Sequence, residues 1–149
     1  MKKLLLTFLA VTSFAYATGM QQQNLTGEQM AAQNTKICEL AAKELSKNLP
    51  QTIDKYTKFV AAKANGTKLE YIFEINTGAK SDQAVQKEDH SRMQNAVTNG
   101  VCQSSKRFFD AQIDISYIYK SAKSKVKLFQ FDISKQTCLD LFKQQKKYY

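Results

Sequence analysis

His90 is the single histidine of this 149-residue chain, and it directly follows two carboxylates, Glu88 and Asp89. A histidine held by a carboxylate is a common general base, so this run is the chain's strongest candidate for acid–base chemistry. Adjacent residues on a helix do not face one another, however, and no nucleophile or set of metal ligands accompanies the run. We therefore expect a solvated or half-packed His90 and a protein that is not an enzyme, with no catalytic residue, metal site or cofactor.

The chain has three cysteines, Cys38, Cys102 and Cys138, which can form one disulfide in three ways. No two of them form a C-x-x-C motif, which argues against a thioredoxin-type redox centre. A zinc site of the usual composition needs several cysteine and histidine ligands, and this chain has a single histidine. The cysteines therefore indicate a disulfide if the chain reaches an oxidising compartment.

The N-terminus has the pattern of an export signal. Lys2 and Lys3 precede an apolar run over residues 4–14 that is too short to span a bilayer, and the Ala-Tyr-Ala sequence at 15–17 is the small-x-small motif of signal peptidase sites. We predict cleavage before Thr18. The cut lacks the cysteine that lipoprotein processing needs, so no lipid anchor is expected. The sequence predicts a periplasmic protein, with secretion as the alternative.

Cleavage at this point would leave enough chain for one small domain with a real core. We predict a signal peptide over residues 1–17, a flexible leader over 18–25 and a single domain over 26–149. No later apolar run approaches the length of a membrane span.

Positive charge dominates the composition, because 22 Lys and Arg residues outnumber 13 Asp and Glu residues. Arg92 and Arg107 are the only arginines, whereas planar recognition of phosphate and guanine favours arginine, so no nucleic-acid partner is expected. Six lysines crowd the segment 120–127 and the C-terminus. We predict that they steer an acidic envelope protein partner: Lys120, Lys123, Lys125, Lys127, Lys146 and Lys147. The alternatives are contact with an anionic membrane surface, or an exposed strand edge kept from pairing by charge.

The first predicted element is a helix over residues 27–48. A capping-box signature at Thr26 starts the helix, and Pro50 ends it. Apolar residues recur along it at helical spacing, with Cys38 and Leu49 at the margin of the stripe. We predict that four of them face a core: Met30, Ile37, Ala41 and Leu45.

A β-hairpin is predicted next, because alternating residues flank Asn65-Gly66, the strongest short-range signal for a hairpin turn. A two-residue turn would place Lys58 on the apolar face of the hairpin, so we predict either a β-bulge in the first strand or a longer turn. Four residues of the second strand share that apolar face: Leu69, Tyr71, Phe73 and Ile75.

The second half of the chain repeats this order. A helix is predicted from Ser81 or Asp82 to about Gly100, with a thinner apolar stripe, and residues 138–145 add a final helical turn. Two strands lie between them, whose core-facing residues are Ile113, Ile115, Tyr117 and Tyr119 on one and Phe129, Phe131 and Ile133 on the other. The order helix, hairpin, helix, hairpin predicts an α+β fold: a four-stranded antiparallel sheet with both helices on one face.

The chain also resembles a group of small exported bacterial proteins, mostly uncharacterised. The shared pattern covers residues 49–138 and consists of Leu49-Pro50, Ile53-Asp54, Thr57, Tyr71, Val101-Cys102, Tyr117, Tyr119 and Cys138. The resemblance implies a helix-and-sheet fold and a bond between Cys102 and Cys138, and it implies no activity. Cys38 is an extra thiol relative to the pattern, and we expect it to be buried and free, with a Cys38 to Cys102 bond as the alternative.

The sequence therefore favours an exported, non-enzymatic protein-binding module of the bacterial envelope. It would be an accessory or pilotin-like part of a secretion machine, or an inhibitor or immunity protein. The alternative is a periplasmic carrier or binder of an anionic lipid or glycan. A cavity between sheet and helices would favour the carrier, and an exposed apolar patch would favour the protein partner.

Overall fold

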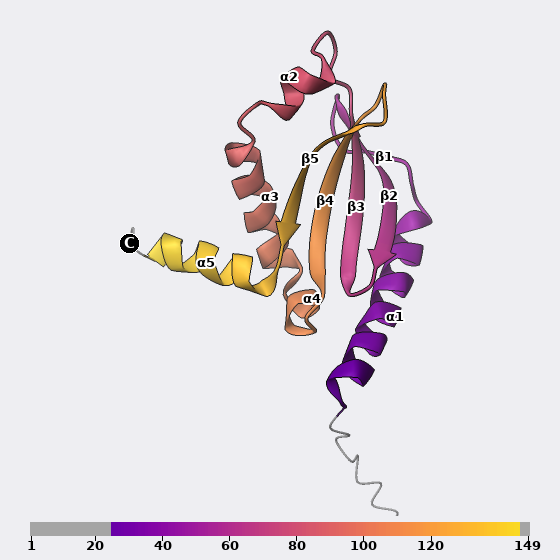
Figure 1. Ribbon diagram of the computed structural model, residues 1–149, viewed down its shortest axis with the longest axis vertical. Helices are drawn as coiled ribbons and strands as arrows, with labels where there is room; N and C mark the ends of the chain where they lie inside the picture. Colours follow the sequence, from indigo (N-terminus) through magenta and orange to yellow (C-terminus); the bar gives the residue numbers. More distant parts are fainter. Residues whose placement is uncertain (1–24, 147–149) are drawn as a thin grey trace, which may run out of the picture.

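The computed structural model describes residues 25–146 and shows a central sheet with helices along both flanks (Figure 1). The predicted signal peptide, all but the last residue of the predicted leader, and Lys147 lie outside the described residues. In chain order the elements are α1 (Gly27–Ser46), β1 (Gln51–Thr52), β2 (Thr57–Asn65), β3 (Lys68–Ile75), α2 (Asp82–Gln86), α3 (Ser91–Ser104), α4 (Lys106–Asp110), β4 (Asp114–Ser121), β5 (Lys127–Ile133) and α5 (Lys135–Lys146).

The sheet has the strand order β1-β2-β3-β4-β5, and every pair is antiparallel except the central pair, β3 and β4, which is parallel. The α+β class is confirmed, but the predicted four-stranded antiparallel sheet is wrong. The chain leaves β3 through α2, α3 and α4 and returns to the end at which β3 began, so β4 runs in the same direction as β3. The extra strand, β1, has two residues and pairs with the start of β2.

The register of the parallel pair aligns the apolar faces of the two hairpins. Tyr71 lies opposite Tyr117, and Phe73 lies opposite Tyr119. Across the second hairpin, Tyr119 lies in turn opposite Phe129. Since side chains alternate along a strand, one face of the sheet is aromatic, and the opposite face carries the intervening polar residues, among them Lys63, Glu70 and Glu74. We call the first of these the aromatic face.

The first hairpin has the predicted bulge. The register of β2 shifts between Phe59 and Ala61, which places Phe59 opposite Phe73 and turns Lys58 to the polar face opposite Glu74. The turn lies one residue later than the Asn65-Gly66 signal indicates, because Asn65 already pairs with Lys68.

Both main helices pack against the aromatic face. From α1, Cys38 and Ala42 join one core cluster with residues of β2 and β3, including Phe59 and Leu69. From the other flank, residues of α3, α4 and α5 form a second cluster with Ile115 and Ile133 at the ends of β4 and β5. The predicted helix over 82–100 is two helices, because Asp89 accepts a hydrogen bond from the Ser91 N–H and starts α3 afresh.

The face that α1 buries differs from the predicted one. Its buried residues are Asn34, Cys38 and Ala42, so Cys38 lies at the centre of the packed stripe and not at its margin. Asn34 occupies a core position because its side-chain amide donates to the Ala111 carbonyl, 2.5 Å away, and so satisfies a backbone acceptor between α4 and β4. Met30 and Ile37, predicted to face the core, are exposed instead.

The structure joins Cys102 to Cys138, the pairing that the resemblance implies, and leaves Cys38 as a buried thiol. The bond connects α3 to α5 across a sequence separation of 36 residues. Closing a loop of that length in the unfolded chain stabilises the fold by about 4 kcal/mol in the chain-entropy model. In the described part of the chain no helix is long and apolar enough to cross a membrane.

We predict that Gly66→Val lowers the free energy of unfolding by about 1 kcal/mol. Gly66 has a φ of 59°, a left-handed conformation that β-branched residues resist, and a Cβ at this position would meet no atom within 4 Å. Backbone strain is therefore the expected cause, and urea denaturation measures it. The matched control is Gly66→Asn, because asparagine tolerates this conformation; equal stability of the two variants would contradict the prediction.

Candidate partner-binding site

A row of stacked rings crosses the aromatic face from one flank of the sheet to the other. Phe59 on β2 contacts Phe73 on β3 with ring centroids 5.1 Å apart, and Phe73 stacks on Tyr119 of β4 at 5.0 Å. Tyr119 stacks on Phe129 of β5 at 4.7 Å, and Phe129 stacks on His90 at 3.8 Å. The row ends at the start of α3, so the aromatic side chains fix the distance between the two helical flanks.

Two tyrosines of this face, Tyr71 and Tyr117, are only partly covered, although their rings stack at 5.1 Å. Their hydroxyls have no hydrogen-bond partner among the described residues. Every side-chain polar atom in this part of the chain that is fully enclosed has a partner. The hydroxyls are therefore open to solvent. Burial of the rings raises the pKa of Tyr71, and burial together with the neighbouring Tyr71 raises the pKa of Tyr117 to about 12.

An exposed apolar stripe lies on α1 next to this face. We call Met30, Ile37 and Leu40 the α1 stripe; their exposed fractions are 39%, 36% and 57%. On a helix of 3.6 residues per turn, Met30 and Ile37 lie about 40° and 60° from Asn34 in the same direction. Asn34 itself bonds to Ala111 beside α4, so both residues border the edge of α1 that contacts this segment.

An apolar cavity of about 320 Å³ lies at the other end of the aromatic row. It is bordered by the β3–α2 connection and the start of α3, and its apolar lining includes Tyr56, Ile75, Val85, Met93 and Phe129. Tyr56 is 57% exposed. The volume is at the low end for a small-molecule site and suits a single large side chain.

Four of the six candidate lysines lie at one place in the described part of the chain. Lys120, Lys123, Lys125 and Lys127 lie at the β4–β5 tip, whereas α5, which ends at Lys146, starts at the opposite end of β5 (Figure 1). Lys147 lies outside the described residues, and the side chain of Lys146 is not described.

Two of the four tip lysines already have partners. Lys125 forms an ion pair with Glu74 at 2.8 Å, and Lys127 donates to the Gln130 side chain at 3.4 Å. Lys120 is partly covered, and Lys123 is exposed. Glu74 compensates the charge of Lys125, whereas Gln130 is neutral and leaves the charge of Lys127 free. The positive charge at the tip that is free to act on a partner is therefore carried by Lys120, Lys123 and Lys127.

His90 and its acidic neighbours do not form an acid–base site. The Asp89 carboxylate accepts from the Ser91 N–H at 2.9 Å, which lowers the pKa of Asp89, and the His90 ring stacks on Phe129. Glu88 forms an ion pair with Lys80 at 2.6 Å. Within residues 25–146 no group of three or more His, Cys, Asp or Glu side chains could hold a metal ion. Cys38 is fully buried, and burial raises the pKa of its thiol, which disfavours the reactive thiolate.

These features define a small α+β protein with a partly uncovered aromatic face, and solved structures share its fold. No protein-family model and no curated protein matches the sequence. A putative secreted protein from Pseudomonas aeruginosa matches 73% of this chain and 96% of its own, at 14% identity and a TM-score of 0.65.

Two pilotins of type II secretion systems also share the fold. The pilotin EpsS from Vibrio vulnificus matches 76% of this chain and 97% of its own, at 14% identity and a TM-score of 0.61. The pilotin AspS from Vibrio cholerae matches 74% and 97%, at 15% identity and a TM-score of 0.58. At these identities the similarity shows the fold alone.

The α1 stripe was not predicted, because the helical spacing of Met30 and Ile37 places them on the expected core face. α1 has more apolar residues than its buried face can hold. In the sequence, the position of Asn34 is the signal that indicates which of these residues stay exposed. A polar residue inside an apolar stripe marks a position whose hydrogen bond must be satisfied by packing.

The partly covered tyrosines predict a fall in stability at alkaline pH. Tyr117 in the folded protein should stay neutral up to a pKa of about 12, whereas the unfolded chain ionises near 10.0. The unfolded state loses its proton first, so the contribution of Tyr117 is complete below pH 10 and is lost as the pH rises toward 12. Urea denaturation at several pH values measures this, with Tyr117→Phe as control. The prediction fails if Tyr117→Phe loses as much stability over this range as the wild type.

Proposed function

We propose that this protein is an exported, non-enzymatic, pilotin-like module that binds another protein of the bacterial envelope. The observation that carries the proposal is the α1 stripe of exposed apolar residues, and the partly exposed Tyr71 and Tyr117 on the aromatic face add apolar surface with hydroxyl groups. Protein interfaces commonly combine an apolar surface with a few hydrogen-bonding groups such as tyrosine hydroxyls.

The isolated fold uses the α1 stripe only in part. Met30 and Ile37 keep more than a third of their surface in water, while the sheet beside them offers aromatic rings that α1 does not cover. A partner that packed along this side of α1 would bury both sets of apolar atoms, at about 25 cal/mol for each Å² removed from water. Tyrosine is among the residues that contribute most to such interfaces, because its ring packs and its hydroxyl bonds.

The shared fold supports this class of function. The solved pilotins belong to type II secretion systems, and the third similar structure is described as a putative secreted protein. The predicted export signal fits a periplasmic role, with secretion as the alternative. The fold similarity and the exposed surface together favour an accessory protein of an export machine over an inhibitor or immunity protein.

The tip lysines would act on the rate of association. Exposed lysines such as Lys123 stabilise a fold little, but they attract an acidic partner over a distance of about one Debye length. Lys125 is paired with Glu74, so we assign the steering role to Lys120, Lys123 and Lys127 ahead of Lys125.

A carrier of an anionic lipid or glycan is the alternative function. Two cavities at the same end of the sheet as the tip contain lysines, Lys80 and Lys123 in one and Lys55 and Lys58 in the other. Each also contains carboxylates, Asp82 in the first and Asp54 and Glu74 in the second, which would repel a phosphate or sulfate group. This balance of charge favours the protein partner.

We predict that Ile37→Glu prevents partner capture and leaves the fold intact. Native periplasmic protein, mildly cross-linked and purified, should yield an envelope protein identified by its mass, and the Ile37→Glu variant should yield at least about tenfold less of it. A charge in a desolvated apolar contact costs more than 1.4 kcal/mol, which corresponds to that factor. The melting temperature should change little because Ile37 is exposed.

The matched control is Leu139→Glu, which introduces the same charge at an exposed leucine of α5. It should capture the partner as well as the wild type does. If the Ile37 and Leu139 variants capture the same protein equally well, the α1 stripe is not the binding surface. If the wild type captures no envelope protein, the proposed function itself is wrong.

A further inference from the structure

A polar cavity separates α3 from α5, on the side of the molecule away from the α1 stripe. Its volume is about 350 Å³, and its walls come from the first half of α3 and the whole length of α5. Four carboxamide side chains line it: Gln94, Asn95, Gln136 and Gln144. Each carboxamide offers both hydrogen-bond donors and an acceptor, so the walls can bind hydroxyl groups in either direction.

The cavity contains a threonine hydroxyl that has no partner within the fold. Thr98 lines the cavity and is 6% exposed, and its hydroxyl has no hydrogen-bond partner among the described residues. No fully enclosed side-chain oxygen in that part of the chain lacks a partner, so this hydroxyl opens into the cavity. A hydroxyl that opens into a cavity bonds to water there, or to a ligand that replaces the water.

The charge of the cavity excludes several ligands. No lysine or arginine lines it, and its only ionisable lining residue is Asp140, whose carboxylate lies 3.8 Å from the Lys143 ammonium and offers no positive charge to an anion. Asp140 accepts from the Gln136 amide at 2.9 Å, so one of its oxygens is already in use. Leu141 is the single apolar lining residue, too little for a lipid chain but enough to contact one hydrocarbon face. The lining therefore fits an uncharged ligand rich in hydroxyl groups.

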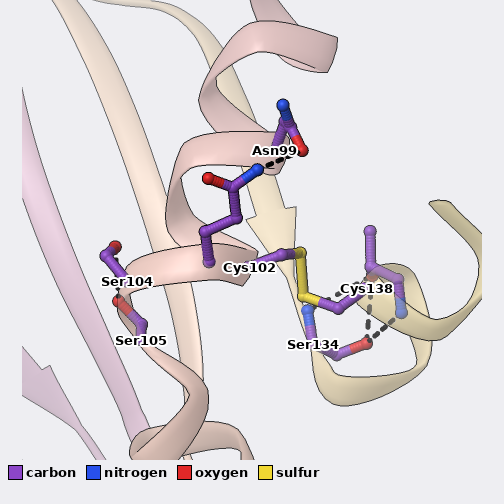
Figure 2. The surroundings of a disulfide bond; sticks show 8 residues. Asn99, Cys102, Ser104, Ser105, Ser134 and Cys138 are labelled. Carbon is purple, nitrogen blue, oxygen red and sulfur yellow. Dashed lines mark hydrogen bonds between the residues drawn. A yellow bond between two sulfur atoms is a disulfide. The ribbon is translucent and has the colours of Figure 1, made fainter. Parts of the chain in front are cut away.

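The disulfide fixes the two walls of this cavity relative to each other. Figure 2 shows Cys102 of α3 joined to Cys138 of α5, with Ser134 below them at the start of α5. Cys102 follows Thr98 by one helical turn, and Cys138 follows Thr137, which also lines the cavity. The Cys138 N–H donates to the Ser134 carbonyl at 3.2 Å, so the lining residue Ser134 is held by the bridged turn. A preorganised wall lowers the entropy cost of binding.

We propose that this cavity binds one or two units of a neutral glycan, with Thr98, Asn95 and Gln136 as its hydrogen-bonding residues. The carboxamides and the Thr98 hydroxyl bind sugar hydroxyls, and Leu141 contacts the C–H face of the ring. The site is separate from the α1 stripe and does not depend on the proposed function. It also differs from the anionic-ligand alternative, because its lining has no positive charge.

Nuclear magnetic resonance titration of the ¹⁵N-labelled oxidised protein tests this site. The probes are chitotriose, an N-acetylated neutral sugar, and cellotriose, which lacks the acetamido groups, each up to roughly 10 mM, to detect millimolar dissociation constants. At least one of them should shift the amide resonances of Asn95, Thr98 and Thr137 in a saturable way. The sugar that binds shows whether the site needs the acetamido groups of chitotriose or takes a neutral sugar without them.

Two variants and one control connect the shifts to the cavity. Thr98→Val keeps the shape of the side chain and removes the unpartnered hydroxyl, and Asn95→Ala removes a carboxamide at an exposed position. Each should weaken binding about three- to tenfold, the value of one hydrogen bond. Gln103→Ala, on α3 but outside the cavity, should bind as the wild type does.

Three results would overturn the proposal. One is the absence of saturable shifts with either neutral sugar. Another is unchanged affinity in both Thr98→Val and Asn95→Ala. The third is tighter binding of an anionic sugar, such as sialyllactose, than of either neutral probe.

Discussion

The parallel pairing of β3 with β4 is the constraint on which the rest of the structure depends. Each hairpin alone has one apolar face, and two hairpins form one core only if those faces lie on the same side and in register. The pairing of Tyr71 with Tyr117 and of Phe73 with Tyr119 achieves this. It also requires a long crossover, because the chain leaves β3 at one end of the sheet and must return to the other end before the parallel strand β4 can start. The three helices of the crossover then cover the β5 flank, and α1 covers the β2 flank.

The helices pack at the two flanks of the sheet and leave part of its aromatic face uncovered between them. A five-stranded sheet presents a wider apolar face than two helices at its flanks can cover, and Tyr71 and Tyr117 stay half-exposed between them. Asn34 then determines how α1 sits. Its bond to the Ala111 carbonyl fits a rotation of α1 that buries Cys38 and leaves Met30 and Ile37 exposed in the stripe that we propose as the binding surface.

Much of this fold could be predicted from the sequence because local rules apply to it. The alternation in Ile113, Ile115, Tyr117 and Tyr119 identifies their shared face, and the misfit of Lys58 predicts the bulge in β2. The parallel central pair could not be predicted in this way, because local patterns do not specify the direction in which two hairpins meet. The rotation of α1 depends on Asn34 and Ala111, which are 77 residues apart. The candidate site was missed for this same reason, and the predicted lysine surface joined the β4–β5 tip to the end of α5, a helix that starts at the opposite end of β5.

The central claim is that the partner packs along α1 on the side of Met30 and Ile37. Site-specific photo-cross-linking in the native envelope tests it most directly, with a benzophenone amino acid placed at Ile37, at Lys63 on the polar face of the sheet, or at Lys123 at the hairpin tip. The account predicts a strong adduct with one envelope protein from position 37, at most a weak adduct from position 123, and none from position 63. An adduct from position 63 or 123 without one from position 37 would contradict it.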